Sequence, residues 1–270
     1  MKYSNRATPE GINNPKAPFW RSFWVMLVSM AAVLAVATWV LGQSGAWLAT
    51  LVSYPREVAL VQKSGALALE ASEQQRALQT LADSLAADLD MQDFQPLTIH
   101  YVDDGTVNAF ATLGGHLLFH RGLITQLQSE NALSMLIAHE LAHVKYRHPI
   151  ASLGQGLAIE AGLSWILGDA EPDIFRGSGF YTRMKFSRDM ELDADIAALE
   201  AVYRRYGHLA GALDLYQVLL RQSRIGSNRY IELMQTHPLT ERRIARLTAH
   251  AEAEGWPLEG ELRPLPPALR

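Results

Sequence analysis

The chain lacks cysteine entirely, so its 270 residues can form neither a disulfide framework nor a lipid anchor on a cysteine. It also has no internal repeat and no stripe of basic residues. Charged residues make up only 19% of it, and its net charge is −4, which argues against nucleic-acid binding. Hydrophobic residues make up 49%, enough for the core of one domain with appendages.

Charge is also absent from one long stretch near the N-terminus. The nineteen residues Phe23–Leu41 contain no charged side chain, and a helix of that length crosses the hydrocarbon of a bilayer. Tryptophans lie near its ends, where membrane proteins favour them, at Trp20, Trp24 and Trp39. Four basic residues and one acidic residue precede it. The positive-inside rule therefore predicts a single-pass anchor, with the N-terminus in the cytoplasm and the remaining chain outside it.

A cleaved signal peptide is the alternative, with Ala35–Ala37 as its cleavage site. The long polar leader and the apolar residues beyond that site favour an anchor, and both interpretations export the rest of the chain. The sequence then divides into five parts: a cytoplasmic tail (1–21), an anchor (22–42), a juxtamembrane segment (43–56), one folded domain (57–254) and a proline-rich tail (255–270).

The folded domain contains the motif His139-Glu140-Leu141-Ala142-His143. Two histidines four residues apart project from one face of a helix and can reach one zinc ion. Glu140 lies beside them, where its carboxylate can take a proton from a water on the metal. The flanking residues are almost all apolar, which predicts a buried helix, capped by Ser129 or Asn131. Such a motif also arises by chance. A metal site therefore requires a third ligand from another part of the chain.

Short elements precede this helix. Residues 56–89 read as a helix with a weak point at Gly65, and 97–102, 108–112 and 116–120 read as strands. This order predicts an α+β fold, mainly helical, of the zincin-like kind. We expect the last strand to be an edge that holds substrate by strand addition, although an ordinary hairpin fits equally well. The residues of this expected substrate strand are Gly115, His116, Leu117, Leu118 and Phe119.

A second apolar stretch, 149–167, follows the motif. Glu160 at its centre disfavours a membrane span, and a single crossing would separate the metal ligands. We therefore expect a helix that is buried or touches the membrane. The segment 168–179 reads as a loop near the cleft, either a mobile lid or a plain surface loop.

The third ligand is expected on the next helix, which Ser187 caps and which ends near Gly207. Glu191 and Asp195 share a face of that helix with two alanines, which allow another helix to approach closely. Glu191 can then reach the zinc, and Asp195 can hold the imidazole of a ligand in place. A solvated acidic face is the alternative.

Together these motifs resemble the gluzincin family of the CAAX prenyl proteases, the HtpX-type proteases and the OMA-type and BepA-type quality-control peptidases. Four segments in family order carry the resemblance, from about Leu97 to Leu247: Asn108-Ala-Phe-Ala-x-x-Gly-Gly115, the HExxH motif, Ser187-Arg-x-x-Glu-x-x-Ala-Asp195, and Thr236-His-Pro238 with Arg243 beyond it.

The resemblance implies one Zn²⁺ per chain on His139, His143 and Glu191, with Glu140 as general base. It also places His237 near the metal, where it stabilises an oxyanion or regulates access. The alternative is that His237 only precedes a helix that starts at Pro238. Arg243 either braces the cleft or is exposed. The other six histidines are expected to be structural or exposed: His100, His116, His120, His148, His208 and His250.

Some members of the family have several membrane helices, whereas this sequence predicts one. The sequence therefore predicts a single-anchor bacterial zinc endopeptidase of the inner membrane, with its catalytic domain in the periplasm. Its expected partners are polypeptides, such as unfolded or misassembled envelope proteins, and the membrane. A chaperone-like binding module with little proteolysis and an inert scaffold with an accidental motif remain as alternatives.

Overall fold

The computed structural model describes residues 19–64, 72–167, 186–217, 220, 237 and 241–270. The predicted cytoplasmic tail, the predicted loop 168–179 and the helix start at Pro238 lie wholly or mostly outside these residues. The helices are α1 (Phe19–Thr50), α2 (Tyr54–Ser64), α3 (Glu73–Asp88), α4 (Arg121–Ile124), α5 (Glu130–Lys145), α6 (His148–Leu167), α8 (Arg188–Tyr206) and α11 (Glu241–Ala253). The strands are β1 (Thr98–Val102), β2 (Ala109–Ala111) and β3 (His116–His120).

The three strands form one small sheet in the order β1-β3-β2. β1 runs parallel to β3, and β2 runs antiparallel to it through the Gly114–Gly115 turn. Both glycines have positive φ, and a Cβ at Gly115 would overlap the Tyr54 hydroxyl, so other side chains are strained there. The fold is therefore α+β and mainly helical, as the zincin-like prediction requires.

The prediction that residues 115–119 form an edge strand is wrong. β3 is the central strand, and residues Leu117–Phe119 pair with β1 on one side and β2 on the other. Its backbone groups are therefore already bonded and cannot accept a substrate strand. The edge strands of the described sheet are β1, whose Ile99 N–H donates to Gln79 Oε1 of α3, and β2, whose three residues are all buried.

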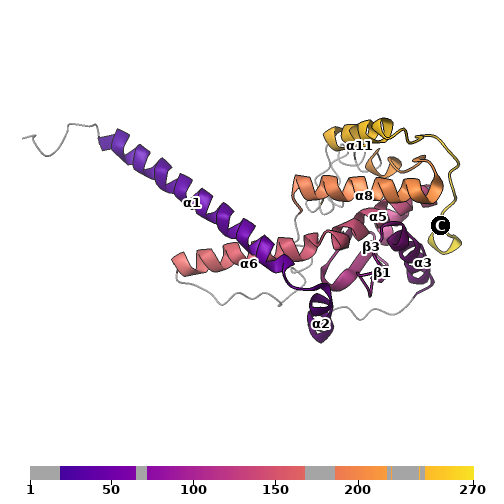
Figure 1. Cartoon of the computed structure of the whole chain (residues 1–270), viewed down its shortest axis with the longest axis horizontal. Coiled ribbons are helices and arrows are strands. Elements are labelled where there is room, and N and C mark those ends of the chain that lie inside the picture. Colours follow the sequence, from indigo (N-terminus) through magenta and orange to yellow (C-terminus); the bar gives the residue numbers. More distant parts are fainter. Residues whose placement is uncertain (1–18, 65–71, 168–185, 218–219, 221–236, 238–240) are drawn as a thin grey trace, which may run out of the picture.

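The HExxH helix is the centre of the domain. In Figure 1, α5 lies between the sheet and α8, and α3 packs against its N-terminal half. Every residue of α5 from Asn131 to Val144 is buried, which confirms the prediction of a buried helix. Small residues let α8 approach it: Ala194, Ala197, Ala198 and Ala201 are at most 5% exposed. Close packing of these two helices brings their polar side chains together.

Side-chain caps fix where these two helices begin. The Ser129 hydroxyl accepts a hydrogen bond from Ala132 N at 3.2 Å, and the Ser187 hydroxyl accepts one from Met190 N at 3.2 Å. α8 ends at Gly207, which adopts a left-handed conformation with φ 74°. These three predicted boundaries are confirmed.

The tail beyond α11 is bound to the domain. Leu265 and Leu269 are buried in the core, and Arg263 O accepts a hydrogen bond from Glu130 N at 2.8 Å. The tail thereby covers the start of α5.

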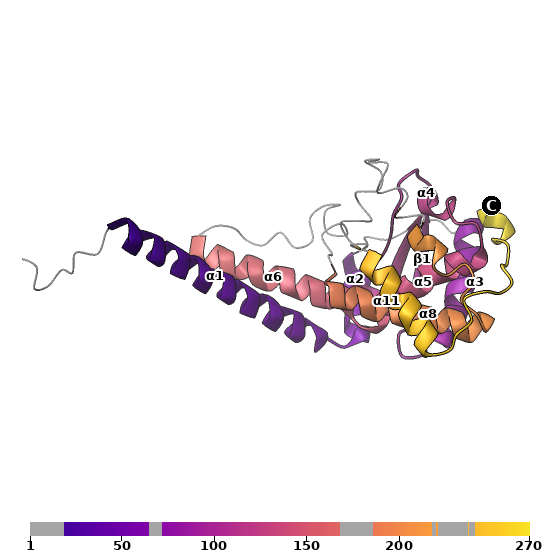
Figure 2. The ribbon, with the colours of Figure 1, turned by 90° about the horizontal axis from the view of Figure 1, so that it is seen from above.

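Helices α1 and α6 lie side by side and project from the domain as a pair, as Figures 1 and 2 both show. They cross at glycines: a Cβ on Gly45 would come within 2.3 Å of Gly154 O, and a Cβ on Gly154 within 2.3 Å of Gly45 O. Farther along, Gly42 faces Ile159 and Leu41 faces Gly162, so the helices are antiparallel. α1 is long and apolar enough to cross a membrane, and only 6% of its apolar window is buried.

Candidate metal centre

Four buried side chains converge where α5 faces α8. His139 and His143 come from α5, Glu191 comes from the first turn of α8, and His237 lies shortly before α11. One ligand atom of each lies within 4.8 Å of those of the other three. The structure therefore brings together the predicted ligands and His237, which are separated by up to 98 residues in the chain.

The spacing of these atoms fits a metal ion. His139 Nε2 lies 3.1 Å from His143 Nε2, and Glu191 oxygens lie 3.5–3.6 Å from the same two nitrogens. Ligands of a tetrahedral zinc ion at about 2.0–2.1 Å are about 3.3 Å apart. Two imidazoles and a carboxylate are also the donor set of catalytic zinc sites with an open fourth position.

His237 lies at that fourth position. Its Nδ1 is 2.9 Å from Glu191 Oε1 and 3.3 Å from His139 Nε2. Its Nε2 is buried and has no hydrogen-bond partner among the described residues, and Glu140 Oε1 lies 3.7 Å away. His237 thus stands between the ligand atoms and the expected base.

Glu140 is held in a defined orientation. The backbone N–H of Ala111, on the free edge of β2, donates to Glu140 Oε2 at 2.8 Å. Its other oxygen faces His237. The carboxylate is 1% exposed, so one oxygen is bonded to the sheet while the other points toward the cluster. This is the arrangement a general base beside a metal requires.

Asp195, Arg243 and Tyr216 form a buried network that contacts the expected ligands His139 and Glu191. Asp195 Oδ1 is 3.0 Å from His139 Nδ1, and the Asp195 carboxylate accepts two hydrogen bonds from Arg243, each of 2.8 Å. The Tyr216 hydroxyl donates to Asp195 Oδ1 at 2.6 Å. Arg243 Nη1 also lies 2.7 Å from Glu191 Oε2, so one guanidinium contacts both carboxylates. Asp195 and Arg243 are therefore neither solvated nor exposed, contrary to the alternative interpretations.

Electrostatics in this pocket favour a positive charge. Burial alone would lower the pKa of His237, but the carboxylates of Glu191 and Glu140 raise it to about 9. Burial opposes ionisation of Asp195, yet its hydrogen bonds from His139 and Arg243 lower its pKa to about 2. Burial, with help from the imidazoles of His139 and His237, lowers the pKa of His143 well below its ordinary value. A neutral imidazole beside ionised carboxylates is the state that binds a metal cation.

Three neighbours were not predicted as parts of this site. His148 Nδ1 lies 2.9 Å from His143 Nδ1, the Phe186 ring stacks on His143 at 4.0 Å, and Tyr216 holds Asp195. His148 was expected to be structural or exposed, and it is a buried neighbour of a ligand. Its position five residues after His143 could have suggested this role. The sequence carries no comparable signal for Phe186 or Tyr216.

Other predicted histidines lie elsewhere. His100 and His116 form a stacked pair on the sheet, with Nε2 and Nδ1 2.8 Å apart. His120 Nδ1 lies 2.9 Å from Asp104.

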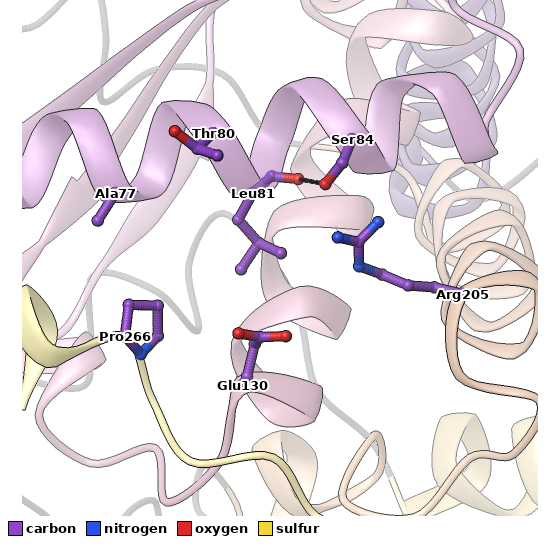
Figure 3. A pocket seen from close by; sticks show the side chains of 7 residues that line it. All are labelled: Ala77, Thr80, Leu81, Ser84, Glu130, Arg205 and Pro266. Carbon is purple, nitrogen blue, oxygen red and sulfur yellow. Dashed lines mark hydrogen bonds between the residues drawn. The ribbon is translucent and has the colours of Figure 1, made fainter.

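A separate pocket of about 360 Å³ lies at the other end of α5, shown in Figure 3. Its lining comes from α3, the start of α5, the end of α8 and the tail: Ala77, Thr80, Leu81, Ser84, Glu130, Arg205 and Pro266. Glu130 is nine residues before His139, a rise of about 14 Å along the helix. The pocket is therefore not part of the cluster.

Comparison with known proteins agrees with this geometry. The family model described as peptidase family M48 matches residues 72–251, two thirds of the chain. The chain belongs to peptidase family M48. This matched region contains the cluster, the base and the Asp195–Arg243 pair, so the domain is a metallopeptidase domain.

Two kinds of relative are similar to it. The beta-barrel assembly-enhancing protease of Escherichia coli (strain K12) is 30% identical over 165 residues, which cover 56% of this chain and 33% of that protein. The mitochondrial metalloendopeptidase OMA1 is 26% identical in Arabidopsis thaliana, covering 56% of this chain and 30% of that protein. In Saccharomyces cerevisiae it is also 26% identical, covering 56% and 46%. The chain thus spans between about a third and a half of the length of these relatives.

Proposed function

We propose that this protein is a membrane-anchored zinc endopeptidase that hydrolyses peptide bonds in unfolded or misassembled envelope proteins. The observation that carries the proposal is the cluster of two imidazoles and a carboxylate with a buried base beside it. The family supports the enzyme class. The name of the Escherichia coli relative supports envelope proteins as substrates.

His139, His143 and Glu191 would hold one zinc ion, which when bound polarises the scissile carbonyl and acidifies its water. Glu140 accepts the proton of the attacking water and passes it to the leaving amine. Ala111 N–H keeps the carboxylate turned toward the cluster. Asp195 orients the His139 ring through Nδ1, and Arg243 keeps Asp195 ionised.

The extended substrate is proposed to lie along β2 rather than β3. Alternate residues of an antiparallel pair bond to the partner strand. Asn108 O and Thr112 N bond to β3, so Ala109 and Ala111 direct their backbone groups outward. Because Ala111 N–H already donates to Glu140, a peptide would pair through Ala109 and the carbonyl of Ala111, and it would pass beside Glu140. Because β2 is buried, the cleft has to open before a peptide can add to it.

We propose that α1 crosses the inner membrane of a bacterium with the catalytic domain in the periplasm. Its exposed apolar surface and the basic residues that precede it support this topology. A reporter that is active only in the cytoplasm, fused after Arg270, should stay silent. An active reporter would reverse the topology, and a mature N-terminus near Thr38 would show cleavage instead.

The test of the enzyme uses the full-length protein and an unfolded polypeptide. We expect about one zinc per chain by elemental analysis, as one three-ligand site requires. Glu140→Gln should keep the zinc and lose proteolysis, whereas Glu191→Ala should lose most of the zinc. Asp193→Asn, an exposed change on the same helix, is the control. Full zinc occupancy in Glu191→Ala would contradict the ligand assignment.

A binding module with little proteolysis is the second candidate. His237 at the fourth position favours it, because an occupied position leaves no place for the reacting water. Retained binding of unfolded chains in Glu140→Gln, together with no measurable cleavage by the wild type, would support the binding module. Cleavage by the wild type alone would support the protease.

A further inference from the structure

Helix α6 combines an apolar sequence with incomplete burial. Glu160 is the one residue among its twenty that is Asp, Glu, Lys or Arg. Beyond Ala151 its described side chains are half-buried or exposed, and among them Leu153 packs against a small buried cluster of the domain. Figures 1 and 2 show α6 leaving the domain alongside α1. The apolar sequence of α6 thus lies against that of the proposed membrane anchor.

The contact between α6 and α1 is of the kind that membranes favour. Gly45 and Gly154 allow the two backbones to touch, and Gly162 meets Leu41. Small residues at such crossings allow close packing where lipid removes any hydrophobic drive between helices. The antiparallel contacts from Gly154 to Gly162 place this part of α6 at known levels along α1.

Two independent features then locate the membrane surface at the same level. A hydrocarbon core of about 30 Å takes about 20 helical residues, and the uncharged run that follows Arg21 reaches that length at Leu41. Ile159 contacts Gly42 and Gly162 contacts Leu41, so Glu160 lies at the same level. Glu160 is exposed there, where its charge can remain in water.

We propose that the end of α6, residues 161–167, enters the outer leaflet of the bilayer beside α1, and that Glu160 marks the surface. The partner of this face is lipid. The proposal rests on the proposed topology of α1, which the experiment tests separately. α6 and α1 then form a two-helix membrane attachment rather than a single anchor.

The chain allows a direct test because it has no cysteine of its own. Single cysteines are placed in the full-length protein in sealed vesicles whose outer face carries the catalytic domain, and a membrane-impermeant maleimide is added. The four positions are all exposed: Gly156 before Glu160, Ala161 beyond it, Ala31 within α1 and Thr125 on the domain. Nothing lies within 4 Å of a Cβ at Gly156, so that variant should fold.

We expect Thr125→Cys and Gly156→Cys to react, and Ala161→Cys and Ala31→Cys to be protected until the bilayer is dissolved. A reactive Ala161→Cys beside a protected Ala31→Cys would overturn the inference and leave the anchor standing. A reactive Ala31→Cys would overturn both. Protection of Gly156→Cys would overturn the boundary at Glu160. Disulfide-linked dimers of Ala161→Cys, with protection that survives solubilisation, would replace lipid by a second copy of the chain.

Discussion

The contacts of Asp195 predict that replacing one of its buried carboxylate oxygens will measurably change stability and zinc binding. Asp195→Asn keeps the shape of the side chain but replaces an acceptor by an amide NH₂ group. In the unmodified protein the Asp195 carboxylate accepts two hydrogen bonds from Arg243 and one from Tyr216, and it faces His139 Nδ1. One amide oxygen cannot accept from Arg243, Tyr216 and His139 together. At least one of these donors is therefore left unpaired in the core.

The size of the loss follows from what remains. Removing one partner of a buried ion pair costs about 3–5 kcal/mol, but Arg243 keeps its 2.7 Å contact with Glu191. We therefore expect the lower limit, about 3 kcal/mol, which lowers the Tm of a domain of this size by about 6–12 °C. Loss of the group that orients His139 should weaken zinc binding by roughly 10–100-fold.

The assay compares zinc affinity, by competition with a chelator, and thermal unfolding of the metal-free protein. Asp193→Asn on the exposed side of α8 is the matched control and should behave as the wild type. Tyr216→Phe removes a single donor and should show a smaller change of the same sign, about 1.5 kcal/mol. It keeps the test informative if Asp195→Asn does not fold. An Asp195→Asn protein with wild-type zinc affinity and wild-type Tm would refute the reasoning.

Three further predictions follow from individual contacts. His237→Ala should raise basal proteolysis of an unfolded chain, because its imidazole stands at the fourth ligand position; a fall of roughly 10²-fold would instead indicate an oxyanion donor, and no change would leave it as the residue before a helix. Ala109→Pro removes an outward N–H of β2 and should raise KM without changing zinc content; an unchanged KM would exclude strand addition there. Burial, then His116, lowers the pKa of His100 to about 4, so the folded state resists its protonation. Stability should be fully present above about pH 6.5 and fall by the order of 2 kcal/mol toward pH 4. His100→Gln should flatten that fall in thermal unfolding measured against pH, and an unchanged pH dependence would contradict it.

Local signals in the sequence predict the centre of this site well. The HExxH spacing places two imidazoles on one face, and Ser129, Ser187 and Gly207 set the ends of helices by bonds within a few residues. Glu191 and Asp195 follow the same logic, since they lie one turn apart on a helix with a face of small residues. These features depend on neighbours in the chain, so a periodic pattern reveals them.

The sequence does not reveal the order of the strands in the sheet or the contacts between side chains that are far apart in the chain. Three short strands can form several sheets, and no side chain in 116–120 indicates that β3 is central rather than an edge. Tyr216 reaches Asp195 from 21 residues away, and Arg243 reaches it from 48. Neither contact follows from periodicity, because each depends on how separate segments pack after the helices have formed.

The short link between α5 and α6 sets how far the cluster lies from the membrane surface proposed at Glu160. Tyr146 and Arg147 alone separate the two helices, so the segment that holds His143 continues into the segment proposed to enter the bilayer. Twelve residues separate His148 from Glu160, a height of at most about 18 Å. An extended chain covers about 3.3 Å per residue. If α6 enters the bilayer as proposed, a polypeptide still embedded there would need a tether of about six residues to reach the level of His148, whose Nδ1 lies 2.9 Å from that of the expected ligand His143.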